Sequence, residues 1–274
     1  MRPRARVVPT NLTVVRKVET MTRRVGWATI VVLSLAACSS ASNSAEQSGT
    51  ITVEYEPTGS YSTAHQILVD SGVMDTVAAE LTDELRLVTD LHLLASECGT
   101  SNAYYDPQAH QVTICYELVE EYRLSADLHQ RHPWEFVESL VWETTYHEIA
   151  HALIDQLDLP ITGNEEDVAD QFVIYQLLPT ETEEERHIIM DVIHQYTHYG
   201  DLNLIDDSAL ADPHSLDSQR AYNYSCYLYG SDREAGNELL DEGLLTTERA
   251  EYCGEEFTRA TEGWEQLLAG HRSG

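Results

Sequence analysis

Basic residues are scarce in this chain, and lysine is almost absent. The 274 residues include 16 Lys and Arg against 47 Asp and Glu, and the single lysine is Lys17. Seven of the basic residues precede residue 39, which leaves nine Arg and 46 acidic residues in the remainder. The formal charge of that remainder, nine minus 46, is −37. This excludes nucleic acid as a partner, because neutralising phosphates requires clustered Lys and Arg.

The N-terminal region also lacks an apolar run long enough to cross a bilayer. The run Gly26–Ala37 has 12 residues and is mostly apolar, whereas a spanning helix needs about 20. Arg23 and Arg24 precede it, a pattern typical of a secretory signal. The run ends in Leu-Ala-Ala-Cys at Cys38, which resembles a bacterial lipobox, where the cysteine receives lipid and becomes the first mature residue.

These features predict three parts. Residues 1–37 form a signal peptide, with Met21 as an alternative start. Residues 38–50 comprise the lipidated Cys38 and a flexible tether of small polar residues, and 51–274 form one folded domain. We therefore expect an exported protein, lipid-anchored to the membrane on the extracytoplasmic face of the cell envelope. Its acidity fits either a solvated surface or adaptation to high salt.

The apolar pattern of residues 51–274 indicates an α+β fold, with strands early and helices late. We expect strands at 51–56, 87–96 and 111–115, and a helix over 65–87. The longer helices expected after Tyr116 cover 133–157, 165–178, 180–198, 216–229 and 246–269.

The expected helix 133–157 contains the most informative motif, His147-Glu148-Ile149-Ala150-His151. An HExxH sequence on a helix places two imidazoles one turn apart on one face, so both reach a single Zn²⁺ at about 2.0 to 2.1 Å. Glu148 lies beside them, where it can act on water at the metal. This predicts a zinc site with His147 and His151 as ligands.

A catalytic zinc site needs a third protein ligand, and the next helix offers acidic candidates. Glu166 and Asp170 are one turn apart, so Glu166 can bind the metal while Asp170 accepts the free ring N–H of a ligand histidine. Glu165 is the alternative ligand, although its position one turn on is occupied by Ala169.

HEIAH followed by ExxxD on the next helix resembles the gluzincin type of zinc metallopeptidase. The segments HEIAHALID, LPITGNEEDVADQF, NAYYDPQAHQVTICYEL and SQRAYNYSCYLYGSD resemble more closely a bacterial metallopeptidase family catalogued as a domain of unknown function. The resemblance covers most of residues 51–270. It implies a zincin-like fold, with a small N-terminal antiparallel or mixed sheet, an active-site helix and a mostly helical C-terminal part. It also supports Glu166 as the third ligand.

These roles predict a mechanism. Zn²⁺ lowers the pKa of its water, Glu148 acts as general base, and a further donor stabilises the oxyanion. His214 is the expected donor, in an order that resembles the gluzincin arrangement, and Tyr222 and Arg220 are alternatives. The strand 111–115 is expected at a sheet edge, where extended substrate pairs in zincins.

Four cysteines remain after Cys38, and an even number in an exported domain favours disulfides. Three connectivities are open. Cys98 and Cys115 flank an expected hairpin, while Cys226 and Cys253 lie in the C-terminal helices, so local pairing predicts the bridges Cys98–Cys115 and Cys226–Cys253.

The combined expectation is a tethered zinc metallopeptidase that hydrolyses peptide or protein substrates. The alternative is a non-catalytic lipoprotein for envelope binding or assembly, in which zinc only stabilises the fold. Bound zinc alone does not separate them, whereas the effect of Glu148→Gln on cleavage does.

Overall fold

The computed structural model describes residues 48–128, 132–178, 183–202, 205–234 and 236–273. The expected signal peptide, Cys38 and most of the expected tether lie outside these residues. Within the described ranges, no helix combines the length and apolar character that crossing a bilayer requires.

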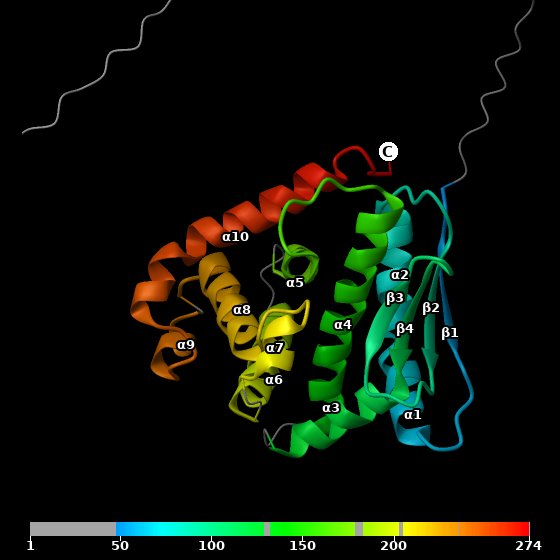
Figure 1. Ribbon diagram of the computed structural model, residues 1–274, viewed down its shortest axis with the longest axis horizontal. Coiled ribbons are helices and arrows are strands. Elements are labelled where there is room, and N and C mark those ends of the chain that lie inside the picture. The colour runs from blue at the N-terminus through cyan, green and yellow to red at the C-terminus, as the bar shows by residue number, and fades with distance from the viewer. Residues whose placement is uncertain (1–47, 129–131, 179–182, 203–204, 235, 274) are drawn as a thin grey trace, which may run out of the picture. The chain divides into compact units, whose positions relative to one another are not determined.

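A four-stranded mixed sheet forms the N-terminal part of the fold (Figure 1). Its strands are β1 (Ile51–Tyr55), β2 (Leu91–Ser96), β3 (Ala103–Asp106) and β4 (Gln111–Cys115), in the order β1-β2-β4-β3. β2 pairs in parallel with β1 and β4, whereas β3 pairs antiparallel with β4. The expectation that β4 is the edge strand is therefore wrong. The hairpin after Asp106 folds β3 onto the outer side of β4, so β3 is the edge on that side.

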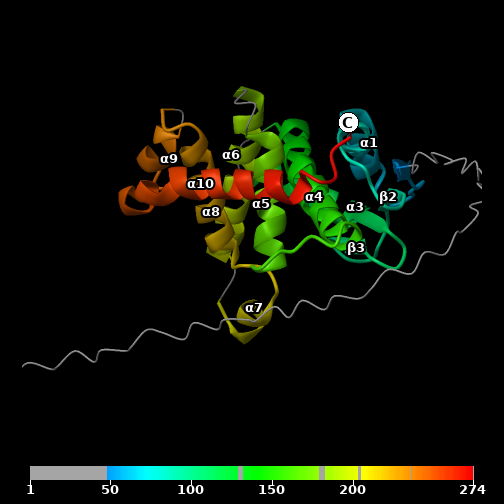
Figure 2. The same ribbon diagram turned by 90° about the horizontal axis from the view of Figure 1, so that it is seen from above.

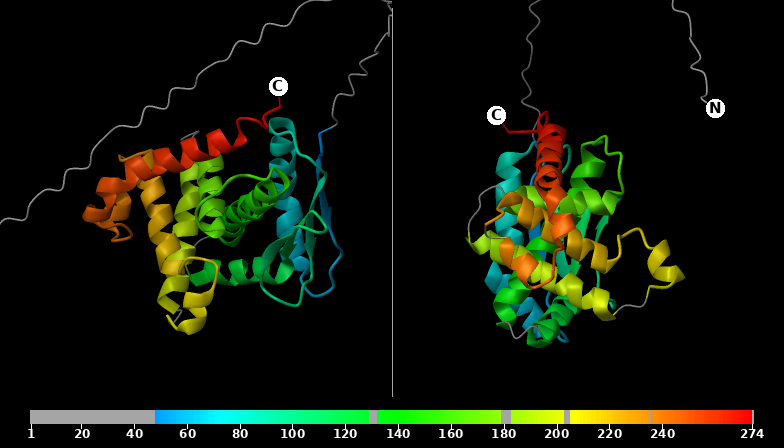
Figure 3. Two further views of the ribbon diagram at one scale, coloured as in Figure 1. Left: turned by 45° about the horizontal axis from the view of Figure 1, so that its top comes forward. Right: turned by 90° about the vertical axis from the view of Figure 1, so that its left-hand side faces the viewer.

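The sheet buries one face. Ile51, Leu91 and Leu93 are almost fully buried, whereas Thr52 is exposed and His92 and Leu94 are only partly buried. This alternation is typical of a sheet with one covered face. Helices α2 (Val73–Glu84) and α4 (Pro133–Gln156) lie against it, and α1 (Ser62–Ser71) packs on α4 (Figures 1 and 3).

The single helix expected over 65–87 is two helices. Gly72 separates α1 from α2 with φ 63°, a left-handed conformation that glycine adopts without steric cost. Both helices bury an apolar face, with Ile67 and Leu68 on one and Met74 and Val77 on the other. The apolar pattern therefore continues across the break, which is why it predicts one helix.

The rest of the described chain is helical, and the predicted α+β class is confirmed. α4 lies between the sheet and the remaining helices and is buried along most of its length. The other helices are α3 (Tyr116–Leu128), α5 (Glu165–Leu177), α6 (Glu183–Leu202), α7 (Asp207–Ala211), α8 (Asp217–Ser231), α9 (Asn237–Asp241) and α10 (Thr247–Leu268).

The C-terminal end of the chain returns to the N-terminal part. α10 crosses the other helices and leads back to the end of α2 (Figures 1 and 2). There the amide of Arg86 donates to the carbonyl of His271 at 2.7 Å, the amide of Ser273 donates to that of Glu84 at 2.8 Å, and Arg272 forms an ion pair with Glu84. The two ends of the fold therefore stabilise each other.

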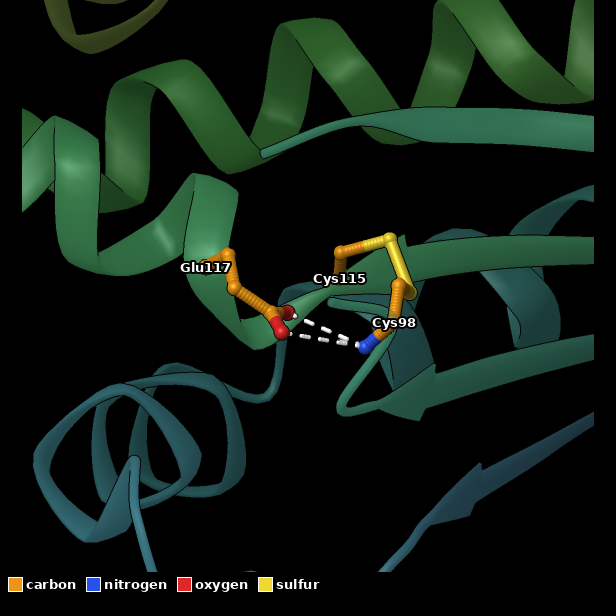
Figure 4. Close-up of side chains that lie close together, drawn as sticks. All are labelled: Cys98, Cys115 and Glu117. Atoms are coloured by element: carbon orange, nitrogen blue, oxygen red, sulfur yellow. Dashed lines mark hydrogen bonds between the residues drawn. A yellow bond between two sulfur atoms is a disulfide. The ribbon is translucent and has the colours of Figure 1, made fainter. Parts of the chain in front are cut away.

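Two disulfides are present, Cys98–Cys115 and Cys226–Cys253, the pairs that local pairing predicts. Figure 4 shows that Glu117 supports the first: its carboxylate accepts hydrogen bonds from the amide of Cys98, at 3.1 and 3.2 Å, and it also accepts one from the amide of Gly99 at 2.7 Å. This fixes the loop before β3 against the start of α3.

The second disulfide joins α8 to α10 where the two backbones come very close. A Cβ on Gly230 would lie 2.3 Å from the carbonyl oxygen of Cys253, a distance that requires a backbone shift. The disulfide at Cys253 opposes such a shift. Gly263, in α10, serves as a comparison, because a Cβ there would meet nothing within 4 Å beyond its own stretch of helix.

Gly230→Ala should therefore destabilise the protein by about 1–3 kcal/mol, the usual cost of overpacking. Gly263→Ala should stabilise it by up to about 1 kcal/mol, since alanine is the better helix former and has room. Urea unfolding of both variants measures the difference. Equal stability of the two variants would contradict the close approach at Gly230.

Candidate metal centre

Helix α4 presents the HExxH motif from the middle of the fold. Pro133 occupies its first turn, where a missing N–H costs nothing, and the helix continues for 24 residues. His147 is buried and His151 is partly buried, one turn further on. Packing on most sides holds the helix, so the two rings have fixed positions.

Helix α5 brings acidic residues to the same place. Asp158 has φ 48°, a left-handed conformation that ends α4 and turns the chain. Asn164 then caps α5, because its Oδ1 accepts a hydrogen bond from the amide of Glu166 at 3.2 Å. Glu165 and Glu166 consequently lie in the first turn of α5, opposite the two histidines.

The donor atoms of His147, His151 and Glu166 meet at one point. Oε2 of Glu166 lies 3.2 Å from Nε2 of His147 and 3.2 Å from Nε2 of His151, and the two Nε2 atoms are 3.3 Å apart. Ligands at about 2.0 to 2.1 Å in tetrahedral geometry are separated by about 3.3 to 3.4 Å. The three donors therefore fit Zn²⁺ in both chemical type and spacing.

The outer ring nitrogens of both histidines face carboxylates. Nδ1 of His147 lies 2.9 Å from Oδ1 of Asp170, and Nδ1 of His151 lies 2.8 Å from Oε1 of Glu165. Such partners fix the ring orientation and leave Nε2 free for a metal. The geometry thus separates the two candidate glutamates: Glu166 faces both Nε2 atoms, while Glu165 orients His151.

A buried polar network lies behind Asp170. Arg220 donates to both Asp170 oxygens, at 2.8 and 2.5 Å, and more weakly to Glu143 at 3.3 Å. Glu143 also accepts from the hydroxyls of Tyr196 at 2.8 Å and Tyr224 at 3.1 Å. All these charges are paired, which offsets the cost of burying them. The sequence motifs do not point to Glu143 or Tyr196, although Glu143 lies one turn before His147.

This network leaves neither alternative oxyanion donor in a suitable place. Arg220 is buried, and its guanidinium lies behind His147, engaged by Asp170 and Glu143 and stacked 4.1 Å from the centre of the Tyr196 ring. Tyr222 is 41% exposed and lies on the opposite side of α8 from Arg220 and Tyr224. The geometry therefore disfavours both residues as contacts of a substrate oxyanion.

His214 does reach the centre. Its Nε2 lies 3.1 Å from Oε2 of Glu166, and its Nδ1 lies 2.8 Å from Oδ1 of Asp212. The ring is nearly parallel to that of His147, with 6.0 Å between centroids, and its side chain is 44% exposed. His214 therefore lies at the rim of the site with one nitrogen directed inward.

Glu148 lies in the wall of a cleft of about 610 Å³ beside the three donors. Tyr104 and Tyr105 of β3 form another part of the wall, and His151, Glu166 and His214 are among the other residues that line it. Burial raises the pKa of Glu148 above its ordinary value, although the neighbouring histidines oppose this. A carboxylate with a raised pKa can accept and return a proton near neutral pH.

Burial and mutual hydrogen bonds shift the pKa values of the groups in the centre in opposite directions. Burial disfavours a charge on His147, but hydrogen bonds to Asp170 and Glu166 outweigh it and raise its pKa to about 10. Burial disfavours the charge on Asp170 too, yet Arg220 and His147 hold its pKa below the ordinary range. Glu166 also has a lowered pKa, because its hydrogen bonds to histidines outweigh its burial.

Two further groups of potential ligands occur in the described residues. Cys98, Cys115 and Glu117 lie together, but their sulfurs form a disulfide and offer no thiolate (Figure 4). Glu143, His147 and Asp170 also lie together, but both carboxylates already form ion pairs with Arg220. The set His147, His151 and Glu166 is the one that opens onto a cleft.

A helix with HExxH, a glutamate from the following helix and a small sheet beside them together resemble the gluzincin type of metallopeptidase. A family model described as "Putative metallopeptidase" matches residues 55–268, and the chain belongs to this family. No curated protein and no solved structure matches the chain.

The raised pKa of His147 predicts how the stability of the metal-free protein depends on pH. A group with a raised folded-state pKa contributes stability below its unfolded value, about 6.5, and loses it as the pH rises toward 10. The free energy of unfolding should therefore fall between about pH 6.5 and pH 10. His147→Gln, which lacks the titrating group, should show a smaller fall in urea titrations, and identical pH slopes would contradict the assignment.

Proposed function

We propose that the protein is a zinc-dependent metallopeptidase that hydrolyses bonds in peptide or protein substrates. The observation that supports this best is the mutual spacing of 3.2 to 3.3 Å among the Nε2 atoms of His147 and His151 and Oε2 of Glu166. Zn²⁺ held by these three residues would have a fourth position open to water or substrate, as in catalytic zinc sites. Membership of the metallopeptidase family supports the same class of function.

When bound, Zn²⁺ supplies a Lewis acid that lowers the pKa of water and polarises a carbonyl. Glu148 takes the proton of the attacking water and then passes it to the leaving amine. Its position in the cleft wall and its raised pKa suit both transfers. Asp170 and Glu165 hold the two ligand histidines in orientation, and Arg220 holds Asp170.

His214 is the proposed donor to the oxyanion. Its ring is exposed toward the cleft, its Nε2 lies at the centre, and Asp212 accepts a hydrogen bond from Nδ1 when that nitrogen is protonated. The carboxylate thereby stabilises the protonated ring, which donates from Nε2. A protonated ring at the edge of the cleft can donate to a negatively charged oxygen that forms there.

We also propose that the domain is tethered outside the cytoplasm through lipid on Cys38. The arginine pair, the short apolar run and the Leu-Ala-Ala-Cys sequence support this. A tether of about a dozen small polar residues would then allow the cleft to reach substrates near the membrane surface.

Cleavage by purified protein, residues 39–274, is tested on a diverse peptide pool with and without chelator. Glu148→Gln should retain one zinc per chain and lose cleavage, because the amide does not accept the proton. His147→Ala should lose stoichiometric zinc, since one of three ligands is missing. Undiminished zinc in His147→Ala by elemental analysis would contradict the ligand assignment. Cleavage that survives in Glu148→Gln would contradict the mechanism, and a wild-type protein that binds zinc without cleaving would favour the binding or assembly alternative.

His214→Ala should keep its zinc and most of its stability, because the ring is half exposed and contacts Glu166 only from the rim. Its kcat should fall about 10²- to 10³-fold, as expected for one lost oxyanion donor, with a smaller change in KM. Steady-state kinetics measure kcat and KM, and elemental analysis measures the zinc content. Wild-type kcat would exclude the role, and loss of zinc would make His214 a ligand.

A further inference from the structure

His214 lies on a segment that has almost no apolar support. This segment, residues 205–216, is called the arm here; it contains α7 and leads into α8. From Ile205 to His214 none of its residues is buried, and α7 contributes none to the core. Figure 2 shows α7 apart from the other helices, and the right-hand view in Figure 3 agrees.

Polar contacts must therefore hold the arm. Several of its hydrogen bonds are internal, such as those from the amides of Ser208 and Ala209 to Asp206. Such bonds shape the arm without fixing its position. His214 likewise donates its backbone amide to Asp212, at 2.9 Å.

Three side-chain contacts described for the arm extend to α5, and all reach its first turn. Nδ2 of Asn164 donates to the carbonyl of Pro213 at 2.7 Å. The hydroxyl of Ser215 donates to Asp167 at 2.7 Å. Between these two contacts, Nε2 of His214 lies 3.1 Å from Glu166. The residues on both sides of His214 are thus fixed to the residues on both sides of Glu166.

Asn164 has two separate contacts. Its Oδ1 accepts the amide of Glu166, and its Nδ2 donates to Pro213. This orientation of the side-chain amide is chemically required, since a backbone N–H only donates and a carbonyl only accepts. One side chain therefore orders the backbone of Glu166 and the residue that precedes His214.

We propose that Asn164, together with the Ser215–Asp167 hydrogen bond, positions His214 for its contact with substrate. Asn164 and Ser215 act through His214 and do not touch the reacting atoms. Because the arm lacks apolar anchors, loss of either contact displaces the ring, and a displacement of about 1 Å can cost up to 10²-fold in rate. This inference rests on the proposed peptidase function.

The test compares Asn164→Ser and Ser215→Ala with Ser208→Ala. Serine at 164 keeps a capping oxygen for α5 but lacks the amide that reaches Pro213. Ser208 is a matched control, because its hydroxyl binds Asp206 within the arm. We expect Asn164→Ser and Ser215→Ala to retain one zinc per chain and to lower kcat about tenfold, with KM changing less. Ser208→Ala should resemble wild type.

Double variants that add His214→Ala to Asn164→Ser or Ser215→Ala distinguish positioning of His214 from a general structural effect. If Asn164 and Ser215 act through His214, the double variants should have the kcat of His214→Ala alone. Losses that multiply would overturn the proposal. So would a loss of zinc in Asn164→Ser that parallels its loss of activity, because the amide would then act only on Glu166.

Hydrogen exchange supplies a measurement that does not need activity. The amides of Leu210 and His214 are hydrogen-bonded within the arm, to acceptors other than the Asp206 carboxylate that Ser208 contacts. They should exchange faster in Asn164→Ser and Ser215→Ala than in Ser208→Ala, because the arm opens locally. If wild type cleaves no peptide, the proposed function fails, yet faster exchange would still support docking of the arm. Equal exchange in all three variants would overturn it.

Discussion

The centre depends on the pair formed by Asp170 and Arg220. Asp170 has two oxygens that accept from Arg220, and one of them also faces Nδ1 of His147. Without Arg220, the buried carboxylate of Asp170 would lose its guanidinium partner and its pKa would rise, which would weaken it as the acceptor of the His147 ring proton. Glu143 and two tyrosines complete the network, which links α4, α5, α6 and α8. The orientation of the His147 ring is thus maintained by residues of four different helices.

The first turn of α5, with its N-cap residue, supplies several of the contacts that define the site. It carries the glutamate that faces both imidazoles, the glutamate that orients His151, and the residues that hold the arm. A helix N-terminus favours negative charge, so three successive acidic residues are tolerated there. A shift of this turn relative to α4 would change the distances from Glu166 to both imidazoles, and it would move His214 as well. Assembly of the candidate metal site is therefore coupled to the placement of the proposed oxyanion donor.

Much of the centre was predictable from local patterns. The i, i+4 spacing linked His147 with His151 and Glu166 with Asp170. Which side of a helix faces the site was not predictable. Arg220 and Tyr222 lie two residues apart in α8, yet Arg220 is buried behind His147 and Tyr222 faces solvent. The same holds for β3, whose four residues pair outside β4 and make the sheet edge, and for Gly72, which divides a continuous apolar pattern. Trp134 is 40% exposed although its apolar ring predicts a core position. Each outcome depends on long-range packing, which a single sequence does not display.

The return of the C-terminus to α2 has a consequence for the order in which the chain can fold. Residues 84–86 meet 271–273 from opposite ends of the domain, and Asp170 gains its cationic partner only when Arg220 of α8 packs beside it. Contacts that are close in the sequence form first, so the Cys98–Cys115 hairpin and its sheet can form before Arg220 reaches Asp170. Contacts of such long sequence separation slow the last stage of folding. The proposed hydrolytic activity would therefore arise only once α8 has packed against α4 and α5, and a chain truncated before Arg220 would lack it.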